Sequence, residues 1–142
     1  MTLLLVNAAS SLYCLGVAWF VQVVHYPLFV AVGEDGWPAY HAAHTTRTGW
    51  VIAGPMLVQL AAAATLAFAA PAGIGALAVW TGLALTLAIF ALTFVGAVPV
   101  HARLAARFDA PAGRRLIHLN GWRTAAWSAH AALAVGMLAA AG

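Results

Sequence analysis

Four apolar segments, each long enough to cross a membrane as a helix, constrain this chain more than any other feature of its sequence. A helix rises about 1.5 Å per residue, so about 20 residues cross the roughly 30 Å of hydrocarbon in a bilayer. Short turns rich in Gly, Pro and Asp separate the segments, which run over about residues 2–32, 37–69, 74–108 and 114–140. We therefore predict an all-α fold in which residues 1–142 form a single domain, a bundle of four transmembrane helices.

The composition excludes an ordinary soluble domain. Hydrophobic residues make up 65% of the chain and charged residues only 6%, whereas soluble domains carry about 25% charged residues. The net charge of +3 comes from six arginines and three acids. Because these arginines lie beside membrane-length apolar runs, we expect them to orient the chain in a membrane and expect no nucleic-acid partner.

The charges are distributed unevenly over the turns. The second turn and both chain ends carry no charged side chain, and all nine charged residues lie in or near the first and third turns: Glu34, Asp35, Arg47, Arg103, Arg107, Asp109, Arg114, Arg115 and Arg123. Positively charged loops usually stay in the cytoplasm. We therefore predict a multi-pass plasma-membrane protein whose charged turns are cytoplasmic and whose termini are both extracytoplasmic.

Histidines from several segments fall at a similar depth beside the charged turns. Counting about 1.5 Å per residue from each charged end places His25, His44 and His101 about 10 Å inside their helices, with His41 one turn shallower. A polar ring in an apolar segment needs a hydrogen-bond partner or another ligand. The sequence therefore predicts a histidine-rich polar site in the cytoplasmic half of the bilayer.

The first and fourth segments add further polar groups to this region. Gln22, His25 and Tyr26 share one face of the first helix, and Asn120 and Arg123 share one face of the fourth. No acid lies at the depth of Arg123, whose guanidinium stays charged. Ionisable residues inside a membrane usually face the bundle interior and mark function, although an arginine can also snorkel to the surface. We expect Arg123, Asn120, Tyr26 and Gln22 to be the catalytic residues.

Two further histidines on the fourth segment remain open. His118 lies about 200° around the helix from Asn120, so the two side chains cannot both face the bundle axis. His130 lies much deeper than the other histidines. The sequence does not decide whether either residue joins the polar site.

The histidines have the chemistry of metal ligands. Neutral imidazole is a common ligand, and the His-x-x-His spacing of the second segment puts two rings on one helical face. Because the membrane core has no Asp or Glu, a nitrogen-only site for copper, zinc or iron, or a haem, fits better than a carboxylate-bridged di-iron site. The predicted ligands are His25, His41, His44 and His101. Histidines that only bond across helices, or that relay protons, are the alternatives.

Two stretches in the last third of the chain resemble a known family. Val98-Pro99-Val100-His101-Ala102-Arg103-Leu104 and Asn120-Gly121-Trp122-Arg123-Thr124 resemble the anthrone-oxygenase-like family of small four-helix membrane proteins. That family has a proline-containing stretch at the end of its third helix and an Asn-x-x-Arg-Thr motif in its fourth. The resemblance implies a four-helix membrane fold, cofactor-poor oxygenation of a polycyclic phenolic substrate, and site roles for Asn120 and Arg123.

These observations predict a membrane-embedded oxidoreductase or oxygenase that acts on a lipophilic small molecule entering from the bilayer. Arg123 would stabilise an enolate, phenolate or carboxylate in a site of low dielectric. His25, His44 and His101 would hold a metal or transfer protons. The alternative is a non-catalytic bundle that binds haem, a metal or membrane lipid, or that serves as an accessory subunit. The sequence leaves the oligomeric state open.

Overall fold

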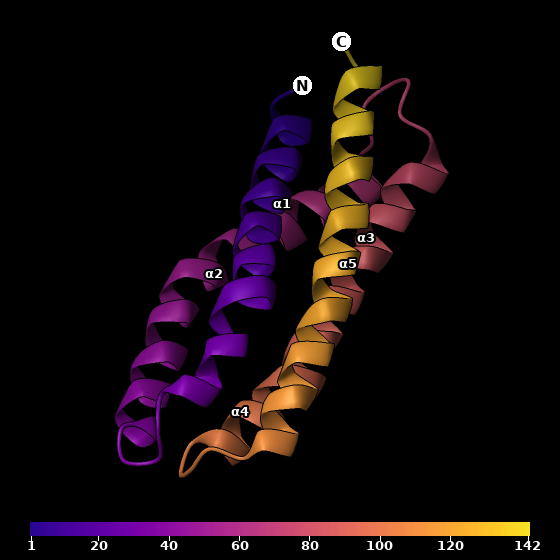
Figure 1. Cartoon of the computed structure of the whole chain (residues 1–142). Coiled ribbons are helices and arrows are strands. Elements are labelled where there is room, and N and C mark those ends of the chain that lie inside the picture. Colours follow the sequence, from indigo (N-terminus) through magenta and orange to yellow (C-terminus); the bar gives the residue numbers. More distant parts are fainter.

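The computed structural model describes all 142 residues, which form four long helical rods joined by three turns (Figure 1). The first rod consists of α1 (Thr2–Phe20), the π-helical turn η1 (Val21–His25) and the 3-10 segment η2 (Pro27–Ala31). The second rod is α2 (Trp37–Phe68). The third combines α3 (Ala76–Ala91), the π-helical turn η3 (Leu92–Ala97) and α4 (Val98–Leu104). The fourth is α5 (Ala110–Ala140).

Three of these rods are long and apolar enough to cross a membrane: Thr2–Ala31, Trp37–Phe68 and Ala76–Leu104. This confirms the all-α prediction and indicates a membrane protein. The fourth rod, α5, is not among them, so the composition of this helix does not support the predicted fourth span. The reason is a set of polar side chains that α5 buries against the other helices instead of presenting to lipid: Asn120, Arg123, Thr124 and His130.

The two ends of the bundle differ in charge. Both chain termini and the α2–α3 turn lie at one end, and the turns that precede α2 and α5 lie at the other (Figure 1). The two charged turns therefore share one end of the molecule, as the connectivity of four rods requires. The opposite end, which holds the termini, has no charged side chain.

Two helix ends differ by four residues from the sequence-based boundaries. The third rod ends at Leu104 instead of residue 108, and α5 begins at Ala110 instead of residue 114. Asp109 is the N-cap of α5 and accepts a hydrogen bond from the backbone N–H of Ala112 at 3.5 Å, as short polar residues commonly do at this position. Trp37 Nε1 donates to the carbonyl of Leu104 at 2.6 Å, which satisfies an acceptor where the third rod ends.

A π-helical turn precedes a proline in both the first and the third rod. Proline has no N–H, so the carbonyl four residues earlier loses its usual partner. Near Pro27, the helix widens and the N–H of Tyr26 bonds to the carbonyl of Val21 at 3.0 Å. The equivalent turn in the third rod, η3, precedes Pro99. Such turns are frequent at functional sites, and here η1 ends at His25, beside the polar groups described next.

Candidate functional site

Four histidines from three rods meet beside the charged end of the bundle. The ring centroids of His25 and His44 lie 4.6 Å apart. Those of His41 and His101, and those of His44 and His101, lie 5.4 Å apart. The structure thus brings together His25, His44 and His101, which the depth estimate placed at one depth, and His41, which it placed one turn shallower. Their role as metal ligands stays a prediction.

The imidazole rings are linked in hydrogen-bonded pairs. His25 Nε2 and His44 Nδ1 lie 2.7 Å apart, and His41 Nε2 and His101 Nδ1 lie 3.2 Å apart. In each pair one ring N–H donates to the bare nitrogen of the other ring. His101 Nε2 also lies 3.0 Å from the hydroxyl of Tyr26. The second pair therefore continues to a phenol, so the cluster can pass protons between adjacent groups.

The same pairing leaves little room for a shared metal ion. No group of three or more His, Cys, Asp and Glu side chains is placed so that it could hold a metal. Both ring nitrogens of His101 already have partners. His44 Nδ1 lies near both His25 Nε2 and the hydroxyl of Thr48, at 2.7 and 3.1 Å. As arranged, the cluster is a hydrogen-bonded relay, and a metal or haem would require several of these bonds to break.

A second polar layer lies deeper in the bundle and joins α1 to α5. The amide of Asn120 donates to Gln22 Oε1 at 3.0 Å and to the carbonyl of Ala18 at 3.2 Å. Arg123 Nη1 donates to Asn120 Oδ1 at 3.4 Å. Gln22 and Asn120 thus hold the position of Arg123 between the helices, while Tyr26 belongs to the histidine relay. Of the four residues predicted to be catalytic, Asn120 bonds to Arg123 and Gln22 bonds to Asn120. Neither Gln22 nor Asn120 lines the pocket that contains Arg123.

Arg123 is the least satisfied polar group of this layer. It is only 8% exposed, its Nε has no hydrogen-bond partner, and its guanidinium carbon lies 5.0 Å from the ring centroid of Trp127. The snorkelling alternative is therefore wrong, because the side chain stays inside the bundle. Burying a cation without an anion beside it costs free energy. An anion bound next to Arg123 would therefore be stabilised by the guanidinium.

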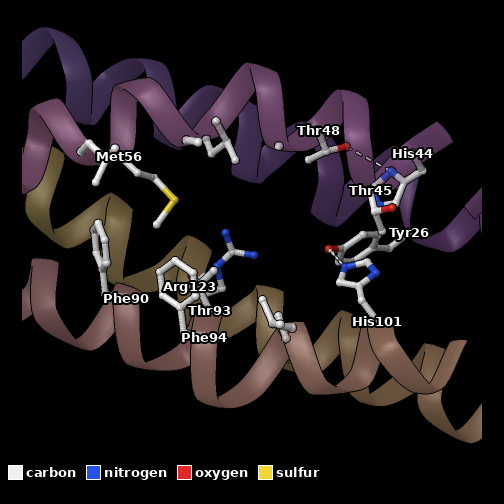
Figure 2. Close-up of a pocket in the computed structure, with 16 residues that line it drawn as sticks. Tyr26, His44, Thr45, Thr48, Met56, Phe90, Thr93, Phe94, His101 and Arg123 are labelled. Atoms are coloured by element: carbon white, nitrogen blue, oxygen red, sulfur yellow. Dashed lines mark hydrogen bonds between the residues drawn. The ribbon is translucent and has the colours of Figure 1, made fainter. Parts of the chain in front are cut away.

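A pocket of about 410 Å³ reaches Arg123 from the membrane-facing surface between α2 and the third rod. Figure 2 shows Tyr26, His44 and His101 at one end of this pocket and the apolar side chains of Met56 and Phe90 at the other. The Arg123 guanidinium lies between the two ends. The lining residues Leu57 and Phe94 are 61% and 59% exposed on the outer surface. Residues on the surface of these rods face lipid in a membrane, so the pocket opens toward the bilayer.

Sequence reasoning missed the apolar wall of this pocket. Met56, Phe90 and Phe94 form the wall, and nothing in their sequence context separates them from ordinary packing residues. Thr48 lines the pocket and contacts His44. Its position four residues after His44 places it on the same helical face, a relation that the spacing in the sequence already indicates.

The two remaining histidines do not join the site. His118 is exposed on the surface of α5. His130 is completely buried and its Nδ1 lies 2.8 Å from the hydroxyl of Ser11 on α1. Between His130 and the pocket, Trp127 Nε1 donates to Gln59 Oε1 at 2.8 Å. These contacts connect α1, α2 and α5 farther from the charged end than the pocket, and they stabilise the packing of the three helices.

Comparison of the chain with protein-family models, with curated proteins and with solved structures found no match in any of the three. The resemblance to the anthrone-oxygenase-like family therefore stays an expectation that depends on the two short stretches quoted above. Function must be inferred from the geometry of the pocket.

Proposed function

We propose that this chain is a membrane oxidoreductase that takes a lipophilic phenolic or enolisable molecule from the bilayer and removes a proton from it beside Arg123. The observation that carries this proposal is the buried guanidinium of Arg123, which has no anionic partner and whose Nε has no hydrogen-bond partner, in a pocket that opens toward lipid. A fixed cation in a water-poor site favours a ligand that becomes an anion during reaction. The apolar wall suits the hydrocarbon part of such a molecule.

In this proposal His44 is the base. Its Nδ1 is engaged by His25 and Thr48, and its Nε2 has no partner within the chain. In the tautomer in which His44 Nδ1–H donates to His25 Nε2, the bare Nε2 can accept the substrate proton. His25 then holds the ring in place, as an orienting group does for a catalytic base. The phenol of Tyr26, held by His101, can donate to an oxygen of the ligand.

The oxidant in the proposal is dioxygen. The carbanion or enolate that forms when His44 takes the proton is oxidised by O2, so that a CH2 group and O2 give a C=O group and water. Arg123 stabilises the negative charge before oxygen reacts. This is the cofactor-poor oxygenation that the resemblance implies, and the relay of hydrogen-bonded rings supports it without a metal.

A second candidate function is a bound metal or haem, with or without catalysis. The close approach of four imidazoles favours it, because metal sites gather such rings. In that case the chain is a haem-, metal- or lipid-binding bundle or an accessory subunit. This candidate requires the paired rings to turn toward a common centre.

One set of measurements on the detergent-purified protein tests both candidates. We expect elemental analysis to find no stoichiometric metal and the absorption spectrum to lack a Soret band. With an anthrone-type substrate, we expect consumption of one O2 per molecule and loss of that activity in His44→Ala. Near-stoichiometric metal or haem that disappears in His44→Ala would replace the proposed function with the second candidate.

We further propose that the charged end of the bundle faces the cytoplasm of a plasma-membrane protein, with both termini outside. The concentration of arginines at this end supports the orientation. Ala110→Cys at the charged end and Ala72→Cys at the other end are exposed positions, and the native Cys14 is buried. In intact cells an impermeant thiol reagent should label Ala72→Cys and spare Ala110→Cys. The reverse labelling pattern would contradict the orientation.

A further inference from the structure

A second membrane-facing groove lies on the other side of the His25–His44 pair, between α1 and α2. It encloses about 370 Å³ and is lined by eight residues: Gly16, Val17, Phe20, Val21, His25, Arg47, Thr48 and Val51. Five of them are apolar residues or glycine from the first rod and α2, and Arg47 is the only charged one. The groove is therefore apolar with one fixed cation.

Arg47 has no partner within the chain. Its side chain is exposed, and the three acids of the protein, Glu34, Asp35 and Asp109, are all exposed in or beside the turns. No hydrogen bond from its guanidinium occurs among the side-chain contacts of α2, where the neighbouring Thr48 instead bonds to His44. An arginine on the lipid-facing surface of a membrane helix requires an anion or water at its head.

The depth of Arg47 indicates where that anion comes from. Arg47 is ten residues beyond Trp37, or about 15 Å along α2, whose 32 residues span about 48 Å. Centring this helix on about 30 Å of hydrocarbon places the Cα of Arg47 about 6 Å inside the boundary, from which the long side chain reaches the phosphate level.

We propose that this groove binds an anionic phospholipid, with Arg47 on the phosphate and one acyl chain along the apolar groove floor. Charge complementarity selects a negatively charged head group. Gly16 leaves space for the chain, because a Cβ at that position would meet no atom within 4 Å. Phe20 and Val51 provide exposed apolar surface on either side.

The bound lipid would touch the same relay as the pocket. His25 lines the groove, and its Nε2 lies 2.7 Å from Nδ1 of His44, which lines the pocket. Thr48 lines both spaces. The two openings are therefore separated by one hydrogen-bonded pair of rings. The lipid site does not depend on the proposed chemistry, since it requires only Arg47 and the groove.

Lipid titration followed by native mass spectrometry tests the site on the delipidated, detergent-purified protein. We expect one phosphatidylglycerol to bind per chain and Arg47→Gln to weaken this binding by about tenfold or more, because a charged hydrogen-bonding group is lost. Gly16→Leu should also weaken binding, by filling the groove. Arg114→Gln removes another exposed arginine, at the start of α5, and should leave binding unchanged.

Three outcomes would overturn the proposal. Equal losses in Arg47→Gln and Arg114→Gln would show binding to net charge instead of a site. Equally tight binding of phosphatidylcholine would remove the requirement for an anionic head group. Full competition by inorganic phosphate at the concentration of the lipid would assign the groove to a free anion. Unchanged thermal unfolding of each variant confirms that a loss of binding does not come from misfolding.

Discussion

Replacing Arg123 with Gln should lower the turnover of a lipophilic substrate by at least about 100-fold, the usual loss when one preorganised charge-stabilising donor is removed. The guanidinium lies in the pocket between the histidine relay and the apolar wall (Figure 2), where the anion of the proposed reaction would form. Glutamine keeps a hydrogen-bond donor but loses the charge. The measurement is O2 consumption with an anthrone-type substrate at saturating and limiting concentrations.

The same variant should unfold at an equal or higher temperature than the natural protein. Arg123 is a buried cation whose Nε has no partner, so removing its charge removes a desolvation cost. Asn120→Ala is the contrasting variant, since Asn120 bonds to both Ala18 and Gln22, and its loss should lower stability by about 1–3 kcal/mol. If Arg123 serves catalysis, Arg123→Gln should lower activity while stability stays equal or rises. If Arg123 serves only the structure, Arg123→Gln should lower both activity and stability.

Arg123→Lys separates charge from geometry. Lysine retains a cation but lacks the planar fork that binds an oxyanion through two parallel bonds. Partial activity in Arg123→Lys with none in Arg123→Gln would match charge stabilisation. Turnover within a few-fold of the natural protein in both variants would contradict the role assigned to Arg123, and the relay alone would then have to carry the chemistry.

The meeting of the four histidines could be predicted from the sequence because depth follows from counting. A helix has a fixed rise per residue, and the short turns that precede α2 and α5 hold the neighbouring rods in register. His25, His44 and His101 lie at similar distances from those turns, so a shared layer follows. Their pairing could not be predicted by counting, because the sequence does not show that the rings bond to one another at 2.7 and 3.2 Å.

The openings of the site could not be predicted from the sequence either. Hydropathy shows that a helix is apolar but does not show which of its apolar residues leave a gap, which depends on how the side chains of two rods fit. The separation of His25 into the groove with Arg47, and of His44 into the pocket with Arg123, depends on this fit. The sequence predicts one polar site. The structure has two openings, the pocket with Arg123 and the groove with Arg47, and the hydrogen-bonded pair of His25 and His44 lies between them.

Gly49→Leu should eliminate ligand binding in the pocket while the protein still folds. Gly49 lines the pocket on α2, and a Cβ at this position would meet no atom within 4 Å. The leucine side chain would therefore extend into the space that the ligand needs. A glycine in the middle of a helix costs about 0.5–1 kcal/mol relative to alanine, so the substitution should leave the stability of the fold equal or slightly higher.

The matched control lies on the same helix. A Cβ at Gly54 would also meet no atom within 4 Å, but this glycine is exposed and lines neither the pocket nor the groove with Arg47. Gly54→Leu should bind and turn over an anthrone-type substrate as the natural protein does, and Gly49→Leu should do neither, with similar thermal unfolding in both. Because leucine adds the same volume in each variant, equal activity of the two would mean that the ligand site lies elsewhere than in this pocket.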